Sequence, residues 1–207
     1  MPRHQKRKSK PRTTATTITR TEVTALTQPV DSKWDHIQGP KTAPITLVEY
    51  GDYECPYCGQ AYPIIKKIQE RLADQLRFVF RNFPMTQVHP HAGNAAEAAE
   101  AAGAQGKFWQ MHDTLYENQQ ALDDDHLEQY AEDYVGLDLT RFRQEMSAHT
   151  YADKVRQDFL SGVYSGVNGT PTFYINGSRY DDSWDYETLL ATLEEILQED
   201  SLEDTNF

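Results

Sequence analysis

The chain holds two cysteines, Cys55 and Cys58, and they stand two residues apart in the stretch ECPYCGQ. Thiols at this spacing can form half of a metal site, a short crosslink, or a redox couple. Each use makes a different demand on the rest of the chain, so the surrounding residues discriminate between them.

The metal and crosslink uses find little support in the sequence. A structural zinc site takes four ligands, usually from two close pairs. The chain has no second Cys-x-x-Cys, and only one residue separates His89 from His91, a spacing that matches no zinc finger. We therefore expect no metal. A static disulfide over so short a loop would remove little entropy from the unfolded chain. The alternative that both cysteines are buried and unreactive stays open.

The residues around the pair favour redox chemistry. Residues 45–50 (ITLVEY) are rich in β-branched and apolar side chains and predict a buried strand. Apolar residues at helical spacing follow the second cysteine and predict a helix. Cys55 should cap this helix, and Pro56 should occupy its first position, where the missing N–H costs nothing.

A helix N-terminus stabilises a thiolate through its free N–H groups and its dipole. Cys55 is therefore the expected nucleophile, and Cys58 is the expected resolving thiol, shielded one helical turn further on. Glu54 opposes this arrangement, since a neighbouring carboxylate raises the pKa of Cys55. We expect that effect to be small if Glu54 points to solvent.

The elements that position the pair follow from the remaining pattern. In a second strand over residues 76–83, Leu76, Phe78 and Phe80 should face inward, and Arg77 and Arg81 outward. The rest of the chain predicts helices over most of 85–166, a strand at 172–175, an Asn-Gly hairpin turn at 176–177, a return strand at 178–181 and a last helix at 186–198. The order predicts an α/β, thioredoxin-like sheet with a helical insertion at about 85–168.

The 207 residues carry a net charge of −12 that is unevenly distributed. Residues 1–33 hold eight Lys/Arg and two Asp/Glu, so we expect a disordered, basic, Thr-rich tail before a domain at 34–207. Docking of this tail on nucleic acid, a ribosome or an anionic membrane stays open. The acidic remainder should not bind nucleic acid, because it would repel phosphates. No apolar run fits a membrane span or a signal peptide, so we expect a soluble, cytoplasmic protein.

Several motifs together resemble one known family: LVEYGDYECPYCGQAYP, FVFRNFP, HPHA, GKFWQMHDTLY and SGVNGTPTFYING. They resemble the DsbA-like branch of the thioredoxin superfamily over residues 34–199. The resemblance implies a thiol:disulfide oxidoreductase that acts on protein or peptide thiols and disulfides and needs no bound cofactor. It leaves the redox partner, a thioredoxin- or glutathione-type system, unspecified.

The resemblance also implies roles for residues outside the cysteine pair. Pro171 would be the cis-proline facing the disulfide, with the backbone at Thr170 pairing with an extended substrate. Pro56 and Tyr57 would lie at the same surface. Glu49 would be a buried acid that takes and returns the Cys58 proton. The alternatives are an ordinary trans-proline at the start of a strand and a carboxylate at a sheet edge that reaches water.

Two departures from the family pattern bear on the direction of exchange. Strongly oxidising members have Pro-His between the cysteines, whereas this chain has Pro56-Tyr57, so we expect a weaker oxidant. Thr170 is more typical of reductases and isomerases. For His89 and His91 we expect capping or packing roles, and we place the aromatic residues at 108, 109 and 116 in the core.

Two other functions stay open. One is a non-catalytic, thioredoxin-like peptide-binding module anchored by its basic tail. The other is a glutathione-linked transferase-type enzyme.

Overall fold

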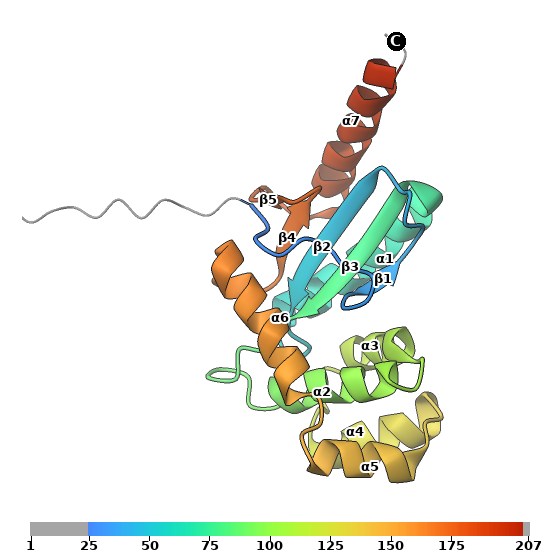
Figure 1. Cartoon of the computed structure of the whole chain (residues 1–207), viewed down its shortest axis with the longest axis vertical. Coiled ribbons are helices and arrows are strands. Elements are labelled where there is room, and N and C mark those ends of the chain that lie inside the picture. Colours follow the sequence, from blue (N-terminus) through green and yellow to red (C-terminus); the bar gives the residue numbers. More distant parts are fainter. Residues whose placement is uncertain (1–24, 205–207) are drawn as a thin grey trace, which may run out of the picture.

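A single five-stranded sheet forms the centre of the protein (Figure 1), whose computed structural model describes residues 25–204. The strands stand in the order β1-β3-β2-β4-β5. They are β1 (His36–Gln38), β2 (Ile45–Gly51), β3 (Leu76–Asn82), β4 (Thr172–Ile175) and β5 (Ser178–Tyr180). β2 and β3 are parallel and the other neighbours antiparallel, which confirms the expected α/β, thioredoxin-like sheet. The edge strand β1 was not expected from the sequence.

Two helices, the first and the last, cover one face of the sheet, and the other helices form an insertion between β3 and β4. The helices are α1 (Pro56–Leu72), α2 (Ala92–Gly103), α3 (Phe108–Glu117), α4 (Asp124–Gln129), α5 (Leu139–Ser147), α6 (Ala152–Ser165) and α7 (Tyr186–Asp204), with short helical turns η1 (Ala73–Gln75) and η2 (Tyr130–Tyr134). In Figure 1, α2 to α5 lie beyond the carboxyl ends of β2 and β3. The insertion therefore covers the end of the sheet at which the cysteine pair stands.

Both faces of the central strands are buried, because neighbouring residues of a strand point to opposite faces. One face of β2 and β3 packs against α1 and α7 in a core that includes Leu47, Phe80 and Ile68. The other face forms a second core that includes Val48 and Tyr50, with Phe159 of α6 packed against it. No outward-facing side remains on these two strands.

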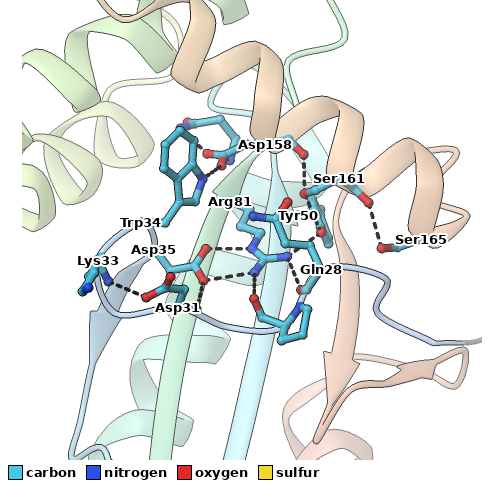
Figure 2. Close-up of polar contacts among 12 residues, drawn as sticks. Gln28, Asp31, Lys33, Trp34, Asp35, Tyr50, Arg81, Asp158, Ser161 and Ser165 are labelled. Atoms are coloured by element: carbon cyan, nitrogen blue, oxygen red, sulfur yellow. Dashed lines mark hydrogen bonds and ion pairs between the residues drawn. The ribbon is translucent and has the colours of Figure 1, made fainter.

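Arg81 is therefore buried, although the alternation of side chains along the strand predicted that it would face outward. It is 1% exposed, and its Nε and Nη2 donate to the Asp35 carboxylate at 2.8 and 3.0 Å. Nη1 donates to the Tyr50 hydroxyl and the Gln28 carbonyl, and Nη2 also donates to the Pro29 carbonyl (Figure 2). All five N–H donors of the guanidinium thus have an acceptor, which is what a buried cation requires.

The segment of residues 25–35 provides most of these acceptors. Leu26 N donates to the Gly177 carbonyl at 2.8 Å, and Thr27 N donates to Ser165 Oγ at 3.0 Å. The packed body therefore begins by Ala25, although the sequence assigned residues up to 33 to a tail. Residues 1–24 lie outside the described part of the chain, so for them the tail stays a prediction.

The hairpin turn after β4 forms as expected. Asn176 and Gly177 have φ values of 48° and 86°, and a type I′ turn needs positive φ at both positions. The Asn176 side chain also accepts a hydrogen bond from Thr46 N at 2.7 Å, which attaches the turn to β2. No helix within residues 25–204 has the length and apolar character that crossing a bilayer takes.

Candidate functional site

The two cysteines stand at the turn from β2 into α1, as the sequence predicted. Cys55 is the N-cap of α1, with extended backbone at φ −72° and ψ 120°, and Pro56 follows at the first helical position. Both thiols are free. Cys55 exposes 4% of its surface and Cys58 none, while the side chain of Tyr57 is 61% exposed. A substrate that approaches this end of the sheet therefore meets the Cys55 sulfur first.

The two thiols differ in acidity because of how they contact each other. A hydrogen bond from Cys58, helped by backbone N–H groups of Tyr57 and Cys58, outweighs burial and lowers the pKa of Cys55 to about 5. Burial, the same hydrogen bond and the charge of Glu49 raise the pKa of Cys58 well above its usual value. At neutral pH the pair therefore holds one thiolate, on Cys55, and one thiol, on Cys58.

Glu49 lies in β2, six residues before Cys55, and only 2% of it is exposed. Its strand stands between β3 and β4, with Phe80 and Phe173 as its register partners. The carboxylate is thus in the middle of the sheet, which contradicts the alternative of an edge carboxylate that reaches water. Its Oε1 has no hydrogen-bond partner in the described structure. Burial, and then the charge of Cys55, raise the pKa of Glu49 to about 8.

Replacing Glu49 by Gln is expected to stabilise the reduced protein at alkaline pH. In the unfolded chain this carboxyl loses its proton near pH 4.5, but in the folded chain it does so near pH 8. Between these values the unfolded state binds fewer protons, so the free energy of unfolding of the native chain falls as pH rises. The variant escapes this loss, which amounts to at most about 5 kcal/mol.

Urea unfolding of both reduced proteins at pH 5 and pH 8.5 measures the effect. The free energy of unfolding of Glu49→Gln, relative to that of the native chain, should increase with pH. The matched control is Glu70→Gln on the exposed side of α1, which should show no such trend. An advantage of Glu49→Gln that is the same at both pH values would contradict the assigned burial of the charge.

The loop before β4 faces the Cys55 sulfur. The Thr170–Pro171 peptide bond is cis, which contradicts the alternative of an ordinary trans-proline. The carbonyl oxygen of Thr170 lies 3.3 Å from Cys55 Sγ. Thr170 Oγ1 also lies 3.8 Å from Met85 Sδ, on the segment between β3 and α2. The cysteine pair, the loop at Thr170 and the segment at Met85 therefore meet at one place.

Asp52 holds the turn that carries Cys55, a role that was not predicted from the sequence. It is 1% exposed, and its carbonyl accepts a hydrogen bond from Cys55 N at 3.1 Å. Its carboxylate accepts from Glu54 N and from Met85 N, each at 2.8 Å. An Asp directly after a buried strand is a turn signal, so the sequence contained an indication of this role.

Gln119, beyond α3, is a second support of this turn that was not predicted from the sequence. Its Nε2 donates to the carbonyl of Tyr53 at 2.7 Å and to that of Cys55 at 3.0 Å. A Cβ on Gly59 would come within 1.9 Å of Gln119 Oε1, so the glycine is what allows this close approach. No local pattern indicates the contact, because 64 residues separate Gln119 from Cys55.

Two expected details of the surroundings differ from the structure. Glu54 does not point freely to solvent, since its carboxylate accepts a hydrogen bond from His91 N at 2.6 Å. His91 stands at the N-cap of α2 but makes no side-chain capping bond, whereas His89 contacts Asp52.

The three aromatic residues of α3 are largely in the core, as expected. Phe108 and Tyr116 are buried, and Trp109 is partly buried against the same cluster. Within residues 25–204, no three His, Cys, Asp or Glu side chains gather as a metal site would require.

Comparison with solved structures gives strong matches. Oxidised BdbD of Bacillus subtilis aligns with a TM-score of 0.74 and 26% identity, covering 84% of this chain and 99% of that one. α-DsbA1 of Wolbachia pipientis aligns with a TM-score of 0.74, covering 86% and 97%. At 17% identity the second match shows a shared fold alone.

Curated relatives include longer proteins named as Na⁺/H⁺ antiporters. NhaA 1 of Salinispora arenicola is 47% identical over 168 residues, and NhaA 3 of Salinispora tropica is 46% identical over 170 residues. Each alignment covers 81% of this chain and 26% of the relative, so the chain spans about a quarter of their length.

The Thioredoxin family model matches residues 31–195, which include the cysteine pair, the helical insertion and the cis-proline loop. This match shows that the chain belongs to the thioredoxin family, and the solved structures show that it shares the fold of BdbD and of α-DsbA1.

Proposed function

We propose that the protein is a thiol:disulfide oxidoreductase that exchanges disulfides with protein or peptide substrates through Cys55 and Cys58. The observation that supports this best is the division between the two sulfurs. Cys55 is an acidic thiol at the start of α1, beside the carbonyl of Thr170, and Cys58 is a weakly acidic thiol buried behind it. One thiol suited to attack and one suited to resolve is the requirement of this reaction.

The proposed reduction proceeds in two displacements. The Cys55 thiolate attacks one sulfur of a substrate disulfide, forms a mixed disulfide with it, and releases the other substrate sulfur as a thiolate. Cys58 then attacks the Cys55 sulfur, forms the Cys55–Cys58 disulfide, and releases the second substrate thiolate. Two electrons pass from the protein to the substrate, and substrate oxidation is the reverse sequence.

Glu49 is the proposed proton acceptor for the second displacement. Cys58 must lose its proton to attack, and burial makes that loss costly in the absence of a nearby base. The raised pKa of Glu49, about 8, lets this carboxylate both take the proton and return it near neutral pH.

The substrate is proposed to be an extended peptide next to the Thr170–Pro171 bond. Backbone groups at this loop would align the chain, and exposed apolar side chains would contact it. Tyr57 is 61% exposed, and Val88, on the segment that contacts Asp52, is 64% exposed. Such a surface would accept many sequences, as suits a general disulfide exchanger.

The reduction potential of the cysteine pair tests the proposal. The protein is equilibrated in graded glutathione buffers and its free thiols are counted. A value of roughly −120 to −180 mV would indicate an oxidant or isomerase, and roughly −230 to −270 mV a reductase. With Tyr57 between the cysteines, we expect a value below the oxidising extreme. The lack of any reversible couple would refute the proposal. The cytoplasmic location of the protein stays a prediction.

A further inference from the structure

The segment between β3 and α2 is attached to the cysteine turn at three points. Met85 N and His89 Nδ1 both contact Oδ2 of Asp52 at 2.8 Å. His91 N donates to the Glu54 carboxylate at 2.6 Å. Asp52 and Glu54 are close neighbours of the nucleophile in sequence, so these contacts bring an imidazole from the insertion to the turn that carries the sulfur.

The same segment also contacts the loop that faces the Cys55 sulfur. Met85 Sδ lies against Thr170 Oγ1, and the Thr170 carbonyl lies 3.3 Å from Cys55 Sγ. The carbonyl of Asp52 accepts from Cys55 N at 3.1 Å. His89 is thus held against Asp52, whose carbonyl bonds Cys55 N, with its side chain only 19% exposed. Partial burial strengthens the effect of a charge there.

The charges around His89 favour its protonated form. Burial works to lower the pKa of His89, but the hydrogen bond and charge of Asp52, with the charges of Cys55 and Glu54, outweigh burial and raise it. Asp52, Cys55 and Glu54, which act on His89, all lie on the cysteine turn. Asp52 and Glu54 would by themselves oppose a thiolate at Cys55, so a cation here cancels an unfavourable field.

We propose that His89, held by Asp52, provides the positive charge that stabilises the Cys55 thiolate. Neither Pro56 nor Tyr57, between the cysteines, is a basic residue, so the cation would come from the insertion instead. The inference rests on the proposed exchange function. His89 acts on the sulfur through space, so it sets the acidity and redox balance of the pair and makes no bond to substrate.

The test compares three full-length chains: native, His89→Gln and His91→Gln. His91 is the matched control, because its contact with Glu54 uses its backbone N–H. Each protein is equilibrated with reduced and oxidised glutathione. In the measured reaction, the protein disulfide and two molecules of reduced glutathione give the protein dithiol and one molecule of oxidised glutathione. At pH 7, His89→Gln should reduce the equilibrium constant for dithiol formation by about tenfold, the effect of one pKa unit at the thiolate. This corresponds to about 30 mV. His91→Gln should match the native chain.

The pH dependence separates a charge effect from a structural one. The difference between native and His89→Gln should exist above the pKa of Cys55, which is about 5, and should vanish once His89 itself loses its proton. His89→Lys, which stays charged, should keep the native equilibrium constant at pH 7 and exceed it at pH 9. A Lys variant equal to the Gln variant, or a pH-independent difference, would overturn the inference.

The two proposals fail in different ways. If the native chain shows no reversible couple, the proposed function is wrong. If all three chains show a couple with one common potential, exchange stands and the role of His89 is wrong.

Discussion

A chain carrying Cys58→Ser should accumulate as a mixed disulfide with its substrate, and a chain carrying Cys55→Ser should show no exchange above the uncatalysed rate. Serine is not ionised at neutral pH, so the second variant lacks the thiolate that the first displacement needs. The first variant keeps the acidic sulfur at the start of α1 but lacks the thiol that releases the substrate.

Mass spectrometry of the intact protein, mixed with a disulfide-bonded peptide, measures both outcomes. Cys58→Ser should gain the mass of one peptide half and lose it on treatment with a reductant. Glu70→Gln, on the exposed side of α1, is the control and should keep the native rate. Full turnover by Cys55→Ser would disprove the assigned nucleophile, whereas peptide binding without exchange by the native chain would favour the thioredoxin-like binding module.

Asp35→Ala should destabilise the protein by about 3–5 kcal/mol, the usual cost of breaking a buried ion pair from one side. The change removes two of the five acceptors of Arg81, which lie at 2.8 and 3.0 Å. In the native chain Arg81, on β3, is 1% exposed and also donates to the carbonyls of Gln28 and Pro29. Its charge would then be buried without a counterion (Figure 2).

The control breaks an ion pair of similar length at the surface. Arg71 and Glu194 lie 2.7 Å apart with side chains 59% and 36% exposed, so Arg71→Ala should cost at most about 1 kcal/mol. The double variant Asp35→Leu/Arg81→Met removes both charges and should be more stable than Asp35→Ala. Urea unfolding gives all three values. If Asp35→Ala and Arg71→Ala lower the free energy of unfolding equally, the buried ion pair contributes no more to stability than the exposed one.

What the sequence by itself determined is local. The placement of Cys55 before Pro56, at the end of an apolar strand, predicts a helix that starts at a thiol, because N-cap geometry and the fixed φ of proline need no distant partner. Asn176-Gly177 predicts its turn for the same kind of reason, since positive φ is a property of those two residues. Apart from the edge strand β1, the order of strands and helices followed from such segments, and so did the class of fold.

The tertiary structure alone decided which groups surround those segments. Strand alternation places Arg81 and Phe80 on opposite faces of the sheet. It does not determine whether solvent or residues 25–35 cover the face that carries Arg81. The contact of His89 with Asp52 spans 37 residues, and that of Gln119 with Cys55 spans 64. Such contacts depend on how the insertion packs over the end of the sheet. The cysteine spacing therefore indicates the chemistry, while packing sets the charges that tune it.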